Sequence, residues 1–185
     1  MGEKLVSGDR FPLIQLRAAD NVIFNPSLYF GKRIFYSFFR FTGCPACNLY
    51  FNQIQAKKRD FEANNIILVG LFEMELEVLK DVLPNKNKDY WGIFLADPIG
   101  KYYDQCGLER SSLKLNINVL NRQFHQTMHS GKEVMLEGVN NRHRNDADGK
   151  KNRMPAQFLV DKKRKVLVSH YGKSIFDRMP LSDII

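Results

Sequence analysis

The chain has 185 residues, of which 44% are hydrophobic and 26% are charged, a composition ordinary for a globular protein with one hydrophobic core. It contains no apolar run near the roughly 18 residues that cross a bilayer, and its first residues lack the apolar segment of a signal peptide, so we expect a cytoplasmic protein without a membrane partner. The net charge of +8 raises the question of nucleic acid. Because the basic runs at 57–59 and 162–165 fall on a predicted helix face and in a predicted hairpin turn, without a nucleic-acid-binding motif, we expect solvated surface there and no nucleic-acid partner.

Apolar segments separated by turn residues predict a mixed α/β fold. After an extended lead-in over residues 8–16, a strand apolar on both faces is predicted at 33–39 and an amphipathic helix at 48–64. A second buried strand follows at 66–72, and such a strand–helix–strand unit places its two strands parallel. The remaining predicted elements are a helix at 75–83, a strand at 92–96, helices at 99–106 and 113–124, a hairpin formed by 156–161 and 165–171, and a final helix at 175–185.

The segment 109–153 differs in character from the rest of the chain. Its second half, residues 138–153, is rich in glycine, asparagine and charged residues and is predicted to be a loop. The segment lacks the apolar residues for a core of its own. We therefore interpret it as an insertion within a single domain that spans residues 1–185.

Cys44 and Cys47, separated by two residues, stand between the strand at 33–39 and the helix that follows. A helix N-terminus stabilises a thiolate with its unpaired N–H groups and the positive end of its dipole. Pro45 falls at the first helical position, which tolerates proline because its N–H has no intrahelical partner. We expect Cys44 to be the exposed nucleophile just ahead of the helix and Cys47, one turn on, to close a disulfide with it.

The three cysteines of the chain are too few for a secreted disulfide scaffold. Cys44 and Cys47 would also serve as half of a zinc site, but tetrahedral zinc needs two more ligands and the sequence has no second close pair, so a redox pair is favoured over a metal site. The third cysteine, Cys106, is interpreted as a small buried residue rather than as a resolving thiol. No dinucleotide-binding fingerprint is present, and we expect neither a metal nor a resident cofactor.

Five segments carry a resemblance to a known family. They are residues 39–49 around the cysteine pair, 8–12 in the lead-in, 97–100 after the third strand, 154–161 before the hairpin, and 171–181. Together they resemble the peroxiredoxin-like (AhpC/TSA, redoxin) family of the thioredoxin superfamily, over nearly the full length, with 109–153 the weakest part. The resemblance implies a thioredoxin-like α/β fold, with a central mixed sheet flanked by helices and an inserted segment before the last hairpin.

The resemblance also implies an activity, that of a thiol-dependent antioxidant enzyme. Cys44 would attack a peroxide or a substrate disulfide, and Cys47 would resolve the product. A thioredoxin- or glutathione-type reductant would supply the electrons. Thr42 and Pro45 belong to the matching motif, and Arg40 is a candidate for stabilising a thiolate or a developing oxyanion through its charge.

A second part of the site is implied by the segment before the hairpin. In the thioredoxin-like interpretation Pro155 has a cis peptide bond and packs beside the disulfide, which leaves the backbone of Met154 free to bind substrate as an extra strand. The alternative is an ordinary proline at the start of a strand.

Two departures from the peroxiredoxin pattern keep other functions open. Ser37 and Phe41 stand where peroxiredoxins carry a proline and a threonine, and the nearest threonine is Thr42. The alternatives are a thiol–disulfide reductase without peroxidase activity and a non-catalytic redox sensor or interaction module that uses 109–153 as its partner surface. The sequence names neither the substrate nor the reductant, and it leaves the oligomeric state, for which we consider a homodimer, undetermined.

Overall fold

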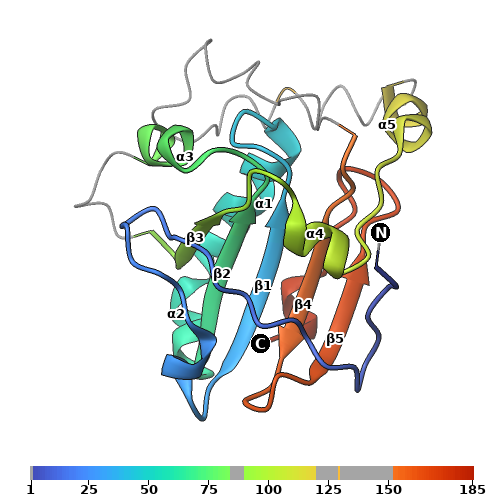
Figure 1. The fold of residues 1–185 in the computed structure, drawn as a ribbon. Coiled ribbons are helices and arrows are strands. Elements are labelled where there is room, and N and C mark those ends of the chain that lie inside the picture. The colour runs from blue at the N-terminus through green and yellow to red at the C-terminus, as the bar shows by residue number, and fades with distance from the viewer. Residues whose placement is uncertain (1, 84–89, 120–128, 130–151) are drawn as a thin grey trace.

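A five-stranded mixed sheet forms the centre of the computed structural model, which describes residues 2–83, 90–119, 129 and 152–185 (Figure 1). The strand order is β3-β2-β1-β4-β5. The strands are β1 (Arg33–Phe39), β2 (Ile66–Phe72), β3 (Ile93–Ala96), β4 (Ala156–Val160) and β5 (Val166–Tyr171). β1, β2 and β3 run parallel, whereas β4 is antiparallel to β1 and β5 to β4. The mixed sheet, the parallel βαβ unit and the closing hairpin are confirmed.

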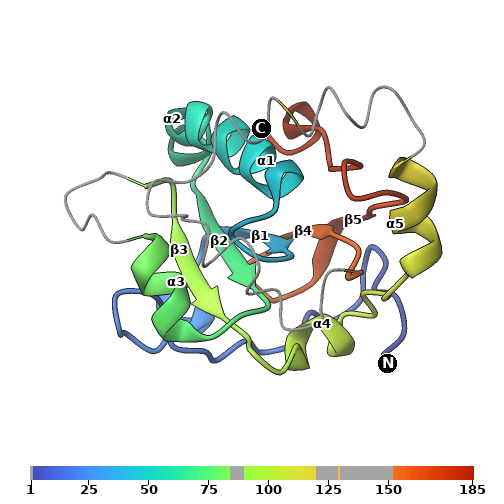
Figure 2. The ribbon, with the colours of Figure 1, turned by 90° about the horizontal axis from the view of Figure 1, so that it is seen from above.

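Helices cover both faces of this sheet. The α-helices are α1 (Pro45–Ala56), α2 (Lys58–Ala63), α3 (Leu76–Val82), α4 (Lys101–Gln105) and α5 (Ser112–Val119), and short 3₁₀ helices occupy Pro26–Tyr29 and Leu181–Asp183. α1 and α2 lie over one face and α4 over the other (Figure 2). The helix expected at 48–64 is therefore two helices, because the backbone of Lys57 leaves helical geometry at ψ 6°. Within the described ranges no helix is both long enough and apolar enough to span a membrane.

The central strand β1 is buried on both faces, as predicted, and so divides the core into two clusters. Phe35 and Phe39 pack into the cluster under α1, whereas Tyr36 and Phe38 pack into the cluster under α4. This alternation follows from the twofold side-chain period of a strand. The thiols discussed below are assigned to one cluster or the other by the same rule.

The final helix predicted at 175–185 is wrong. Only the short turn Leu181–Asp183 is helical. Upstream of it, the Asp177 carboxylate accepts a hydrogen bond from the Lys173 N–H at 2.7 Å, and the Ser174 hydroxyl accepts from the N–H groups of Phe176 and Asp177. Such side-chain acceptors compete with helical hydrogen bonds, and Pro180 disfavours helical geometry in the residue before it.

The two ends of the predicted insertion meet beside the sheet. Arg110 and Arg153 form an antiparallel bridge, and the Ser111 N–H donates to the Asn152 carbonyl at 2.8 Å. The helix predicted at 113–124 is described only as far as Val119, and most of the loop predicted at 138–153 lies outside the described residues.

Candidate active site

The cysteine pair begins α1 directly after the carboxyl end of β1. Cys44 is the N-cap residue, with extended φ and ψ of −82° and 113°, and Pro45 is the first helical residue, as predicted. The turn before the helix is closed by the Cys44 N–H, which donates to the Phe41 carbonyl at 3.1 Å. Asn48 completes it, since its side-chain amide donates to the carbonyls of Thr42 and Cys44 at 2.7 and 2.9 Å. The backbone that holds the first thiol is thus fixed from both sides.

The expectation that Cys44 is exposed is wrong. Its side chain is 1% exposed and that of Cys47 is 2% exposed. Both belong to the apolar cluster under α1, which also contains Phe41 and Tyr50. Packing of these rings over the end of β1 covers the thiols, and the thiols are unpaired, without a disulfide. A reactant must therefore be small or must displace part of this cover.

Arg40 lies beside the first thiol, where the sequence analysis considered it. Its guanidinium Nη1 is 3.4 Å from Cys44 Sγ, and the side chain is only 5% exposed. The guanidinium also lies over the Phe41 ring, 5.3 Å from its centroid. A charge that is held by burial and ring contact in this way interacts more strongly with a thiolate than a solvated charge does.

The two thiols have opposite acidities. Burial alone raises the pKa of Cys44, but the hydrogen bond from the Cys47 thiol and the charges of Arg40 and Arg178 outweigh it and lower that pKa to about 5. Burial raises the pKa of Cys47, and the hydrogen bond to Cys44 and the charge of that thiolate raise it further. The pair therefore shares one proton at neutral pH, with Cys44 as thiolate and Cys47 as thiol.

Arg178 is a site residue that sequence reasoning missed. Its Nη2 is 3.5 Å from Cys47 Sγ, although 131 positions separate the two residues in the chain. The guanidinium stacks over the Tyr50 ring, 5.7 Å from the centroid. The Tyr50 hydroxyl in turn donates to the Met179 carbonyl at 2.9 Å and holds the segment in place. No sequence signal marks Arg178, because the irregular path of its segment decides where it points.

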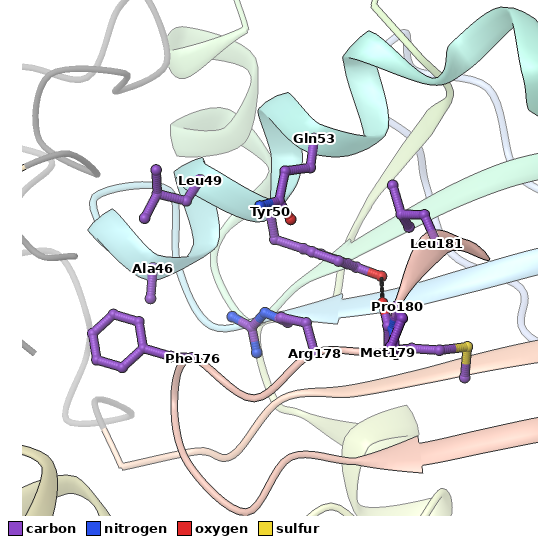
Figure 3. A pocket seen from close by; sticks show the side chains of 9 residues that line it. All are labelled: Ala46, Leu49, Tyr50, Gln53, Phe176, Arg178, Met179, Pro180 and Leu181. Atoms are coloured by element: carbon purple, nitrogen blue, oxygen red, sulfur yellow. Dashed lines mark hydrogen bonds between the residues drawn. The ribbon is translucent and has the colours of Figure 1, made fainter. Parts of the chain in front are cut away.

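A pocket of about 270 Å³ opens between α1 and this C-terminal segment (Figure 3). The lining residues are Ala46, Leu49, Tyr50, Gln53, Phe176, Arg178, Met179, Pro180 and Leu181. The Arg178 guanidinium lies between Ala46, Phe176 and the Tyr50 ring (Figure 3). Neither cysteine lines the pocket, but Arg178 connects it to Cys47.

Met154 and Pro155 do not form the predicted second part of the site. No peptide bond among the described residues is cis, so the Met154–Pro155 bond is trans and continues an extended chain into β4. The Met154 N–H is also not free, since it donates to the Glu109 carbonyl at 3.0 Å. The pairing of the two ends of 109–153 occupies the backbone that was expected to bind substrate, and Pro155 packs instead against Gly172.

Thr42 contributes backbone rather than a side-chain hydrogen bond to the site. Its carbonyl accepts from Asn48, whereas its buried hydroxyl Oγ1 has no partner within the described part of the chain. The structure thus brings Arg40, Cys44 and Cys47 together with Arg178. It does not place Met154 or Pro155 in contact with the thiols.

Cys106 lies on the opposite side of the sheet from the pair. It is fully buried in the cluster under α4, and burial strongly raises its pKa. This position supports its interpretation as a small core residue. Among the described residues, no group of three or more histidine, cysteine, aspartate or glutamate side chains has an arrangement that could hold a metal ion.

A buried ion pair supports the loop next to Arg40, and it too escaped sequence reasoning. Arg153 donates to both carboxylate oxygens of Glu73, at 2.9 and 3.2 Å, and neither side chain is exposed. Arg110 and Asp104 extend the network at 2.7 and 2.9 Å. A buried charge needs such partners, but sequence spacing does not reveal them, because 80 positions separate Glu73 from Arg153.

Comparison with known proteins adds the fold. No protein-family model and no curated protein sequence matches this chain. Among solved structures, peroxidoxin BcpB from Mycobacterium tuberculosis is similar with a TM-score of 0.62 at 17% identity, over 93% of this chain and 90% of that one. Thiol peroxidase from Chromobacterium violaceum is similar with a TM-score of 0.64 at 11% identity, over 100% and 86%.

A third similar structure is a putative thiol:disulfide interchange protein DsbE from Chlorobium tepidum, with a TM-score of 0.58 at 15% identity, over 98% of this chain and 92% of that one. Likeness at these identities speaks to architecture, and it confirms the resemblance drawn from the sequence at that level. The chain has the thioredoxin-like fold in the form that peroxiredoxins share.

Proposed function

We propose that this chain is a thiol-dependent redox enzyme that reduces peroxides through Cys44, with Cys47 as the resolving thiol. One observation carries the proposal: the Cys44 sulfur is buried between the Cys47 thiol and the Arg40 guanidinium, which together with Arg178 lower its pKa to about 5. A thiolate is the reactive form of cysteine, so Cys44 is prepared for attack at neutral pH. A resolving thiol already stands in hydrogen-bond contact with it.

The reaction proceeds in three balanced steps. The Cys44 thiolate attacks the nearer peroxide oxygen, the O–O bond breaks, and the alcohol leaves once its oxygen has taken a proton, so Cys44 becomes a sulfenic acid. The Cys47 thiol then attacks that sulfur, which releases water and forms the Cys44–Cys47 disulfide. An external dithiol, of the thioredoxin or glutathione type, returns both cysteines to thiols and is itself oxidised.

Arg40 has a defined role in the first step. Negative charge moves from sulfur to the departing oxygen as the O–O bond breaks. A guanidinium 3.4 Å from the sulfur offers N–H donors to both the thiolate and the peroxide oxygens. Because the side chain is almost fully buried, those donors are not competing with bulk water.

Burial of the thiols favours a peroxide over a protein disulfide as substrate. A small peroxide needs little space, whereas a disulfide in a folded protein must bring its backbone to the site. The Met154 N–H that would pair with such a backbone is occupied by Glu109. The second candidate, a thiol–disulfide reductase, is favoured by the close cysteine spacing and by the similar structure described as a thiol:disulfide interchange protein.

The test compares wild type with Cys44→Ser, Cys47→Ser and Cys106→Ser in peroxide consumption and in reduction of an insulin disulfide. We expect turnover of peroxide by wild type and by Cys106→Ser, none by Cys44→Ser, and a sulfenic acid on Cys44 that accumulates in Cys47→Ser and is trapped by dimedone. Disulfide reduction without peroxide consumption would replace the peroxidase by the reductase. A disulfide that forms with oxidant but gives no turnover with any reductant would replace both by a redox sensor.

A further inference from the structure

The pocket between α1 and the C-terminal segment has two kinds of wall. Leu49, Phe176 and Leu181 present apolar side chains, and the Tyr50 ring adds an aromatic face (Figure 3). The Arg178 guanidinium supplies the positive charge at the end of this wall, next to Cys47. A pocket of this kind fits a ligand that is apolar along most of its length and negatively charged at one end.

Arg178 lacks hydrogen-bond acceptors inside the described part of the chain. Of its three guanidinium nitrogens, Nη2 contacts Cys47 Sγ, whereas Nε and Nη1 are buried and have no partner. Buried donors on a charged group are costly when they are unsatisfied, and nearly all such groups in folded proteins find partners. A planar fork of N–H donors matches a carboxylate, which can accept two hydrogen bonds from it.

We propose that this pocket binds the apolar chain of a carboxylate-bearing molecule, with its carboxylate on Arg178, and that organic hydroperoxides of this type are preferred substrates of the site. The second half of this proposal rests on the proposed function. Ala46 lies both in the pocket wall and between the two cysteines in the sequence, so a ligand held there is next to the redox pair. Binding energy gained from the chain and the carboxylate is then available to hold the hydroperoxide at the thiolate.

The binding test uses octanoate as the probe and the Cys44→Ser variant, which cannot turn over peroxide. Calorimetry compares octanoate with 1-octanol, which lacks the charge, and with acetate, which lacks the chain. Arg178→Leu removes the donors, and Arg178→Lys keeps the charge without the fork. Arg59→Leu is the matched control, because it removes the same charge from an exposed position on α2.

We expect octanoate to bind at least about tenfold more tightly than either partial analogue. Arg178→Leu should weaken octanoate binding by about tenfold or more, Arg178→Lys by less, and Arg59→Leu not at all. Equal octanoate affinity in wild type and Arg178→Leu, or no octanoate binding at all, overturns the proposed ligand.

The turnover test compares hydrogen peroxide with a fatty-acid hydroperoxide, in wild type and in Arg178→Leu. The expected result is a KM for the fatty-acid hydroperoxide that rises about tenfold or more in the variant, with a much smaller change for hydrogen peroxide. If octanoate binds through Arg178 and neither peroxide is consumed, the binding site stands and the peroxidase fails. If hydrogen peroxide is consumed but Arg178→Leu leaves the fatty-acid hydroperoxide KM unchanged, the peroxidase stands and the substrate class fails.

Discussion

The main-chain N–H of Glu73 donates a 3.2 Å hydrogen bond to the carbonyl of Arg40. This contact joins two buried charges with different tasks. The Glu73 side chain is held by Arg153 in the core, and its backbone fixes the residue whose guanidinium lies beside Cys44. The buried ion pair is therefore a support for the active-site arginine as well as a part of the folded core.

Breaking this ion pair should be strongly destabilising. Arg153→Met leaves the Glu73 carboxylate buried without its main partner, and we expect the free energy of unfolding to fall by about 3–5 kcal/mol. Glu73→Gln combined with Arg153→Met should cost less than the sum of the two single changes, because each single change alone leaves an unpaired group. Urea denaturation of the four proteins measures the coupling.

The matched control for that cycle is the exposed pair of Lys57 and Asp60, whose nitrogen and oxygen are 2.9 Å apart. Lys57→Ala should cost less than about 1 kcal/mol, since solvent screens an exposed pair. A cost for Arg153→Met as small as that for Lys57→Ala would contradict the role given to the buried pair.

Removal of the Arg40 charge should make Cys44 less acidic. In Arg40→Leu the thiolate loses a guanidinium donor 3.4 Å away, and we expect the pKa of Cys44 to rise by roughly one pH unit or more. Arg40→Lys should give a smaller rise. The measurement is the pH dependence of alkylation in the Cys106→Ser background, with Arg59→Leu as the control for a lost surface charge; an alkylation profile that Arg40→Leu leaves in place would rule out the interaction.

Stability should depend on pH through Cys44. Its pKa is about 5 in the folded protein and near the ordinary 9.0 in the unfolded chain, so the unfolded chain binds more protons between these values. Stability from this group is therefore complete above about pH 9 and is lost as the pH falls through about 5. The raised pKa of Cys47 places its titration above this window.

Denaturation under reducing conditions at several pH values, compared between wild type and Cys44→Ala, isolates this contribution. We expect wild type to gain roughly 1 kcal/mol or more relative to the variant as the pH rises across the window. Parallel pH curves for the two proteins would show that the thiolate is not stabilised in the fold.

Cys106 should take no part in the redox cycle. The sheet separates it from Cys44 and Cys47, and burial in the other cluster strongly raises its pKa. In the Cys44→Ser, Cys47→Ser double variant we expect the remaining thiol to be alkylated only after unfolding. Mass spectrometry after a timed exposure to iodoacetamide measures this, and rapid native labelling, or a disulfide between Cys106 and Cys44 in oxidised wild type, would contradict the assignment.

The sequence by itself determined the parts of this protein that depend on local pattern. A doubly apolar strand, a Cys-Pro-Ala-Cys turn and an amphipathic helix specify β1, the helix start and the place of Cys44, because burial period, proline and cap act over a few residues. The same locality explains the parallel β1–β2 pair and the final hairpin. It also gave Arg40, which is four positions from Cys44.

Only the tertiary structure decided how the thiols are covered and which distant charges reach them. Arg178 approaches Cys47 because its segment folds through local side-chain hydrogen bonds instead of forming the predicted helix. The trans bond before Pro155 and the occupied Met154 N–H follow from pairing of the two ends of 109–153. These outcomes depend on contacts between segments far apart in the chain, whose energies no short sequence window contains.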